Sequence, residues 1–188
     1  MALLKHPRRC RSLAALSLFA LTARGLRSQE AHPEYEVKAA YLLNFARYAA
    51  WPGSGGSEAA GDLVICVLGH DPFGAVLDRT VAGRTVLGRP VRVLRPANRA
   101  EAGPCQLAFV GGDRRSEIEP WLSDLSDRPV LTVGDGAQFT DAGGAIGFVV
   151  RDRTVRFEVN LDALRHSGVK LSSRVLALAS RVEGEAAR

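Results

Sequence analysis

The sequence has few of the residues, and none of the motifs, on which most enzyme classes depend. Its three cysteines and four histidines include no Cys-x-x-Cys pair and no set at the spacing of zinc ligands. It contains no Gly-x-Ser-x-Gly nucleophile turn and no phosphate loop ending in Gly-Lys-Ser/Thr. The sequence therefore predicts no metal, no cofactor and no catalytic nucleophile, so a protein other than an enzyme is expected.

The chain also lacks the repeats that indicate a solenoid and the basic excess that indicates nucleic-acid binding. Its 188 residues suit one domain. Much of the formal net charge of +5 comes from the first 23 residues, which hold Lys5, Arg8, Arg9 and Arg11 and no acid. Taking these four from the 25 basic residues leaves 21 against 20 acidic residues. We therefore expect no nucleic-acid partner.

No apolar run near the amino terminus reaches the roughly 20 residues of a comfortable membrane span. A basic start is instead followed by an apolar run over residues 13–23, which is the pattern of a secretory signal peptide. We predict a signal peptide over residues 1–23, a short linker over 24–33 and a periplasmic location. Leu21, three residues before the expected cleavage site, departs from the small-residue preference. An uncleaved amino-terminal anchor is the alternative.

Only two cysteines, Cys66 and Cys105, follow the predicted signal peptide. An even pair in an exported domain favours a disulfide. This bond would close a loop of about 40 residues and contribute roughly 4 kcal/mol in the chain-entropy model. Two separate buried thiols are the alternative.

Helical and strand-like patterns alternate over residues 34–183, which we predict to form the folded domain, with 184–188 as a flexible tail. Val37, Tyr41, Phe45 and Tyr48 recur at helical spacing and predict a helix that begins at Pro33 and ends at Trp51-Pro52. A continuous apolar run from Leu63 to Leu68 predicts a strand buried on both faces. The patterns that follow predict, in order, a helix from Asp71 to Leu77, strands over 90–94 and 106–110, a helix over 116–125 and a strand over 129–133.

The pattern changes after Gly134. Residues 145–150 and 154–159 predict an antiparallel hairpin around Arg151-Asp152-Arg153, which we interpret as solvated loop charges. Asn160 is expected to cap a helix that starts at Leu161. A last helix is predicted from one apolar stripe, made of Leu171, Val175, Leu178, Ala179 and Val182. The whole predicts an α/β fold: a mixed, mostly parallel sheet flanked by helices, with a carboxy-terminal hairpin and helix.

Two polar features invite a functional interpretation. His70-Asp71 follows the first predicted strand and is typical of the start of an acid–base pair, although an exposed histidine in a turn is the simpler interpretation. Charged residues alternate along a predicted edge hairpin from Arg156 to Asn160. Such a row can block sheet aggregation, or it can serve as a docking surface for another protein. Composition alone does not choose between these two roles.

The mature sequence resembles the YfiR family of periplasmic regulators. The matching stretches are Glu36–Tyr48 with Trp51-Pro52, Val64–Gly69 with Asp71-Pro72-Phe73, Leu131–Val133 with Gly134-Asp135, and Val155–Asn160 through Gly168–Ser173. The resemblance implies a small α/β fold and repression, by binding, of the periplasmic sensor region of a membrane diguanylate cyclase. It also implies lower cyclic di-GMP, an outer-membrane lipoprotein that draws the regulator away, and a homodimer.

The resemblance also carries expectations for single residues. Cys66 and Cys105 match the family's structural disulfide. Glu158 and Leu164 match positions of its repressing surface, to which the adjoining Arg156 and Asn160 are added. A second cysteine pair of some relatives is absent, since Thr140 and Gly147 stand near those positions, which puts redox control of that kind in doubt.

These observations predict a periplasmic regulator that acts by binding a membrane diguanylate cyclase or a related receptor. One alternative is a small-molecule receptor or carrier with its pocket at the carboxyl ends of the strands. Another is a periplasmic hydrolase built around His70 and Asp71.

Overall fold

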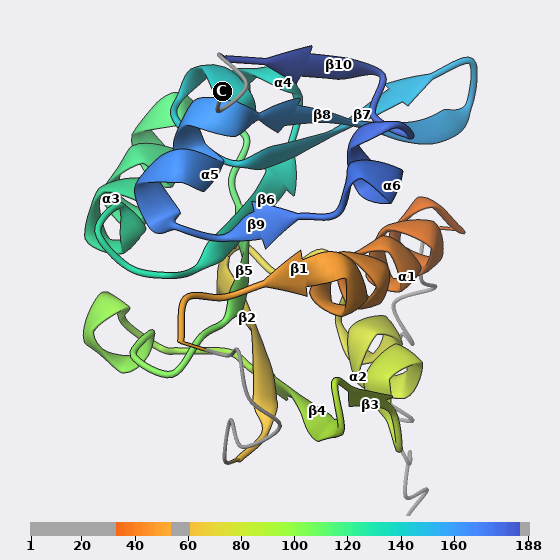
Figure 1. Ribbon diagram of the computed structural model, residues 1–188, viewed down its shortest axis with the longest axis vertical. Helices are drawn as coiled ribbons and strands as arrows, with labels where there is room; N and C mark the ends of the chain where they lie inside the picture. The colour runs from red at the N-terminus through yellow and green to blue at the C-terminus, as the bar shows by residue number, and fades with distance from the viewer. Residues whose placement is uncertain (1–32, 54–60, 185–188) are drawn as a thin grey trace, which may run out of the picture.

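The central feature of the fold is a sheet of eight strands, in the spatial order β10-β8-β7-β6-β5-β2-β4-β3. The computed structural model describes residues 33–53 and 61–184 (Figure 1). The strands are β2 (Leu63–Gly69), β3 (Thr85–Val86), β4 (Arg89–Leu94), β5 (Leu107–Gly111), β6 (Leu131–Asp135), β7 (Ile146–Arg151), β8 (Thr154–Asn160) and β10 (Arg181–Glu183).

Five adjacent strands, from β7 to β4 in the spatial order, are parallel. Strand β3 is antiparallel to β4, and β8 is antiparallel to β7. Strand β10 then pairs in parallel with β8. The predicted α/β fold with a mixed, mostly parallel sheet is confirmed. Strand β2 is buried on both faces from Leu63 to Leu68, as its continuous apolar run predicts.

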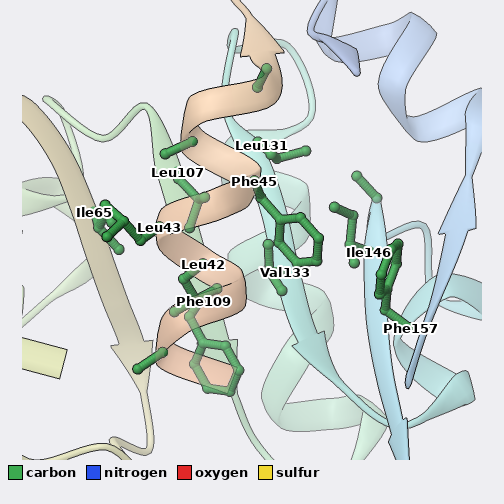
Figure 2. Close-up of a cluster of buried hydrophobic side chains, with 14 of the residues drawn as sticks. Leu42, Leu43, Phe45, Ile65, Leu107, Phe109, Leu131, Val133, Ile146 and Phe157 are labelled. Carbon is green, nitrogen blue, oxygen red and sulfur yellow. The ribbon is translucent and has the colours of Figure 1, made fainter. Parts of the chain in front are cut away.

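Helices cover both faces of the sheet. On one face, α1 (Pro33–Tyr48) and α2 (Ala75–Val81) share a core with alternate strand residues. Figure 2 shows Leu42, Leu43 and Phe45 of α1 lying over this face. On the other face, α3 (Arg115–Leu125) and α4 (Ala137–Asp141) pack over the intervening residues of the same strands.

The first predicted helix is confirmed, and its aromatic stripe divides between core and surface. Phe45 is 1% exposed and Tyr41 packs against the same core. Val37 and Tyr48 are 45% and 43% exposed. A helix that lies on a sheet buries one side only, so the outer members of the stripe meet solvent.

The antiparallel hairpin of β7 and β8 is also confirmed. Its strands pair from Ile146 with Val159 down to Arg151 with Thr154. The two residues between them, Asp152 and Arg153, have φ angles of 51° and 58°. Positive φ at both central positions is the conformation of a type I′ turn, whose twist suits a two-residue hairpin.

The short helix after β2 begins later than predicted, at Ala75 instead of Asp71. The reason is the Asp71 side chain, whose Oδ1 accepts hydrogen bonds from the backbone N–H groups of Phe73 and Gly74. An aspartate that bonds its own downstream backbone favours a turn over a helix.

The predicted long last helix is wrong. After α5 (Leu161–Ser167) and the short strand β9 (Lys170–Leu171), only Ser173–Leu176 form a helical turn, α6. Leu178 is 69% exposed, and Val182 lies in strand β10. Ser180 donates both its backbone N–H and its hydroxyl to the carbonyl oxygen of Phe157. These bonds direct the chain into the sheet, where it forms β10.

Three smaller elements complete the fold. A two-stranded sheet pairs β1 (Ala49–Ala50) with β9 and so joins the end of α1 to the carboxy-terminal part (Figure 1). One 3₁₀ turn spans Arg99–Glu101.

Within the ranges 33–53 and 61–184, no helix is both long and apolar enough to cross a membrane. The predicted signal peptide, residues 1–23, lies outside the described residues. The predicted linker and tail also lie outside them, except for residue 33 of the linker and residue 184 of the tail.

Candidate partner-binding surface

Glu158, in the middle of β8, is a charged residue in a buried position. It is 2% exposed and lies on the sheet face that also carries α4. Its Oε1 accepts a hydrogen bond from Arg151 Nη2 at 2.9 Å. Its Oε2 lies 3.7 Å from Arg181 Nη1. A buried carboxylate is tolerated only when it is paired, and here both cations come from flanking strands.

This arrangement corrects two expectations. Strand β8 is not an edge strand at Glu158–Asn160, because β10 pairs with these residues on the side away from β7. Arg151 is 60% exposed, but it is more than a solvated loop charge, since its guanidinium neutralises a buried carboxylate. Alternation along the strands places Arg151, Arg156, Glu158 and Arg181 on one face.

The structure places the other three predicted contact residues in different settings. Arg156 is exposed and forms no ion pair within the described part of the chain. Asn160 caps α5 as predicted, its Oδ1 accepting from the N–H groups of Asp162 and Ala163, while its side-chain amide donates to the Thr140 carbonyl. Leu164 is 6% exposed and belongs to the buried core that residues of α1 also line. Of the four, Arg156 is exposed, Asn160 is half-buried, and Glu158 and Leu164 are buried, and their role in binding stays a prediction.

The disulfide between Cys66 and Cys105 is present, with the two Cα atoms 5.7 Å apart. Cys66 lies in β2, and Cys105 lies just before β5, the neighbouring strand. Both residues are buried in the core on the α3 side. The bond therefore joins two adjacent strands at the centre of the sheet.

A second buried ionic group, which the sequence did not indicate, lies at the carboxyl end of β6. Lys38 of α1 is 3% exposed and donates to Asp135 Oδ1 at 2.7 Å. It also pairs with Glu34, one turn earlier in the helix. Tyr35 donates its hydroxyl to Asp135 Oδ2 at 3.0 Å. A lysine inside the apolar stripe of the first helix was the one available signal, because a buried lysine requires an acid.

Burial raises the pKa of the Tyr35 hydroxyl, and the nearby Asp135 carboxylate raises it further. Both effects disfavour a phenolate. The phenol therefore stays a hydrogen-bond donor to Asp135, and this part of the site is structural and well satisfied.

His70 and Asp71 do not form an acid–base pair. One Asp71 carboxylate oxygen accepts the two backbone N–H groups described above, and the other accepts from Arg95 Nε at 2.7 Å. Arg95 also binds Asp78, and its pKa is raised, with the Asp78 hydrogen bond as the largest cause. His70 is exposed, and its backbone N–H donates to the Gly111 carbonyl. The carboxylate is thus committed to holding the turn.

The surface is hollowed at the edge opposite to the predicted pocket. A cavity of about 540 Å³ lies near the start of β6, between α3 and α5. Its lining includes the apolar residues Leu122 and Val130 and the acids Glu119 and Asp127. At the carboxyl end of β6, where a ligand was predicted, Asp135 is occupied by Lys38 and Tyr35. In residues 33–53 and 61–184, no three His, Cys, Asp or Glu residues are grouped as metal ligands.

A family model described as YfiR/HmsC-like matches residues 35–180. The chain belongs to the YfiR/HmsC-like family. The family match begins within the first turn of α1, covers the elements from there to α6, and stops just before β10. The resemblance seen in the sequence is thereby confirmed.

Solved structures with a similar fold are distant in sequence from this YfiR/HmsC-like chain. A conserved domain protein from Vibrio cholerae is similar with a TM-score of 0.55 and 11% identity, over 79% of this chain and 60% of its own length. The ABC domain from Streptococcus pneumonia, in complex with L-Trp, has a TM-score of 0.48 and 12% identity, over 64% of this chain and 55% of its own. This chain therefore spans about three fifths of the Vibrio cholerae protein, and at that identity the likeness concerns the fold alone.

Proposed function

We propose that this protein is a periplasmic regulator that binds and represses the sensor region of an inner-membrane diguanylate cyclase or a related receptor. The observation that carries the proposal is the family match over residues 35–180. The Cys66–Cys105 disulfide fits an oxidising compartment. An outer-membrane lipoprotein that draws the regulator away, and a homodimer, belong to the same proposal.

The mechanism is binding without turnover. A receptor that exchanges between an active and an inactive state is shifted by any protein that contacts one state more tightly. To move such a receptor from about 99% active to about 99% inactive, the regulator must bind the inactive state about 10⁴-fold more tightly. Such a preference requires a surface that is complementary to one receptor state and does not require a reactive group. The structure agrees with this, because the Asp71 carboxylate, a candidate acid–base group, is held by hydrogen bonds in its own turn.

Deletion and complementation test the proposal. Removing the protein should raise cellular cyclic di-GMP, measured by mass spectrometry, and periplasmic expression of the full chain should restore the low level. A matched control is the same chain without residues 1–23, which should stay in the cytosol and leave the level high. Unchanged cyclic di-GMP in the deletion strain would contradict the proposed target.

The cavity of about 540 Å³ favours a second candidate function, the binding of a small molecule. Its volume lies within the range of about 300–1,000 Å³ of small-molecule sites, and its lining mixes apolar and polar residues. Thermal-shift screening of periplasmic metabolites against the purified protein tests this candidate. A ligand whose effect is lost when Leu122→Arg fills the cavity would support it.

A further inference from the structure

Strand β10 covers less than half of the β8 edge. It pairs through Arg181, Val182 and Glu183 with the last three residues of β8, Glu158–Asn160. On the same side of β8, Thr154–Arg156 have no strand partner among the residues that the structure describes. Part of a seven-residue strand is thus left with an open edge, a surface on which extended segments bind.

The contact between β10 and Glu158 is incomplete. Oε2 of Glu158 is buried and has no hydrogen-bond donor in the described part of the chain. The nearest guanidinium nitrogen of Arg181, at 3.7 Å, is beyond hydrogen-bonding distance. The same guanidinium also pairs with Glu183. A buried charged acceptor without a donor is costly, so a better-placed donor at this position would be favoured over Arg181.

Besides its pairing with β8, β10 contacts α5. On its outer side no other strand of residues 33–53 and 61–184 pairs with it, and Val182 is 44% exposed. Leu178, just before it, is 69% exposed. The firmest anchor is the pair of hydrogen bonds from Ser180 to the Phe157 carbonyl, at the point where the strand begins. A strand of three residues at the end of the fold is the kind of element that opens locally.

We propose that β10 is a displaceable cover, and that the protein partner binds by adding its own extended strand along β8 in place of β10. The segment that fits has at least six or seven residues and an arginine or lysine opposite Glu158, where it donates to the free Oε2. This inference rests on the proposed function for the existence of a partner. On this proposal the predicted role of the buried Glu158 in binding does not require its side chain to reach the surface.

A tethered cover strand has a further consequence. Because β10 belongs to the same chain as β8, and α5, β9 and α6 lie between them in the sequence, it competes with a partner strand intramolecularly. The cover therefore protects the edge of the free protein from pairing with other strands. A partner strand that pairs with all of β8 gains backbone hydrogen bonds that the three-residue cover cannot make. Strand exchange therefore favours a partner whose extended segment is long enough to pair with all of β8 and carries an arginine or lysine opposite Glu158.

A disulfide between β8 and β10 tests displacement in the cell. Val159 and Val182 are register partners, and neighbouring strands lie about 4.8 Å apart, close enough for the bond. The oxidised Val159→Cys/Val182→Cys protein should fold and fail to lower cyclic di-GMP, whereas each single cysteine variant should repress like the wild type. A locked protein that still represses would overturn the inference and leave the proposed function standing.

A peptide probe tests the edge without any partner. The chain truncated after Ser180 should bind a labelled synthetic peptide of residues 178–184, followed by fluorescence anisotropy. Replacing the arginine of that peptide by glutamine should weaken binding about tenfold or more, since the buried Glu158 carboxylate loses the positive charge next to its Oε2. The locked protein should not bind the peptide. A truncated chain that keeps its far-ultraviolet circular dichroism and ignores the peptide, or that does not distinguish arginine from glutamine, would overturn the inference.

The cellular experiment and the peptide experiment distinguish failure of the proposed function from failure of the strand-exchange inference. If the wild type does not change cyclic di-GMP, the proposed function fails, and the peptide measurements still decide whether the β8 edge accepts a strand. If the truncated chain does not fold, the comparison of full-length and locked proteins with the same peptide decides instead. Binding of the peptide to the full-length protein but not to the locked protein supports the inference. Equal peptide binding by the full-length and the locked proteins overturns it.

Discussion

Lys38 Nζ lies 2.7 Å from Oδ1 of Asp135 and so joins the first helix to the carboxyl end of β6, across 97 positions of the sequence. The lysine side chain is 4% exposed and that of Asp135 is 29% exposed. This contact fills the edge of the sheet at which open α/β folds commonly bind ligands. The protein's own side chains therefore occupy the carboxyl end of β6.

The first prediction concerns this ion pair. Lys38→Met leaves Glu34 and Asp135 without their shared cation, and we expect it to lower the free energy of unfolding by about 2–4 kcal/mol. Asp135→Asn leaves Lys38 paired with Glu34 and should cost less. The double variant should lose clearly less than the sum of the two single losses, as measured by urea unfolding.

The pair of Arg115 and Glu119 is a matched control, since it is an ion pair within α3 that faces solvent. Its coupling, from Arg115→Met and Glu119→Gln, should be below about 0.5 kcal/mol. Equal coupling in the two pairs would show that burial of Lys38 contributes nothing.

The second prediction concerns pH and Tyr35. Because its pKa is raised in the folded state, the unfolded chain loses this proton first as pH rises above about 10. The stabilisation is complete below that pH and is lost above it. A tyrosinate absorbance titration should therefore show a component that appears only above the ordinary range, and Tyr35→Phe should remove it. A titration that is the same in the variant would contradict the prediction.

Much of the fold could be predicted from local patterns. The continuous apolar run of β2, the alternation in β8 and the cap at Asn160 each act within a few residues, so the sequence displays them directly. The same reasoning failed after Ser172. Leu178 and Val182 stand at helical spacing, but hydrogen bonds from Ser180 to Phe157, 23 residues earlier in the chain, turn this segment into a strand. The spacing of apolar residues along the chain gives no information about an acceptor as distant in sequence as the Phe157 carbonyl.

The candidate surface was predicted in part for the same reason. The sequence singled out Glu158 but placed it on an exposed edge, since alternation tells which side chains share a face and not what covers that face. Its cover is β10 and its cations are Arg151 and Arg181, which lie 7 and 23 positions away along the chain. A glutamate between two buried apolar residues, Phe157 and Val159, was the available signal that a cation must be close.

The third prediction concerns the disulfide. Replacing both Cys66 and Cys105 by alanine should lower the free energy of unfolding by about 2–4 kcal/mol, because the bond restricts a loop with a sequence separation of 39 residues in the unfolded chain. A reducing agent should destabilise the wild type by a similar amount and leave the double variant unchanged. If the wild type is equally stable in the reducing agent, the bond does not stabilise the fold.

The last prediction separates the two arginines of the hairpin. Arg151 donates to the buried Glu158 carboxylate, whereas Arg153 sits in the turn and forms no ion pair within residues 33–53 and 61–184. Arg151→Gln should therefore lower the free energy of unfolding by about 1–2 kcal/mol, and Arg153→Gln should change it by less than about 0.5 kcal/mol. When Glu158→Gln is already present, the loss from Arg151→Gln should shrink, because there is no longer a charge to neutralise. Equal losses in both backgrounds would mean that Arg151 acts through packing alone, and Glu158 would then depend on β10 for its only cation.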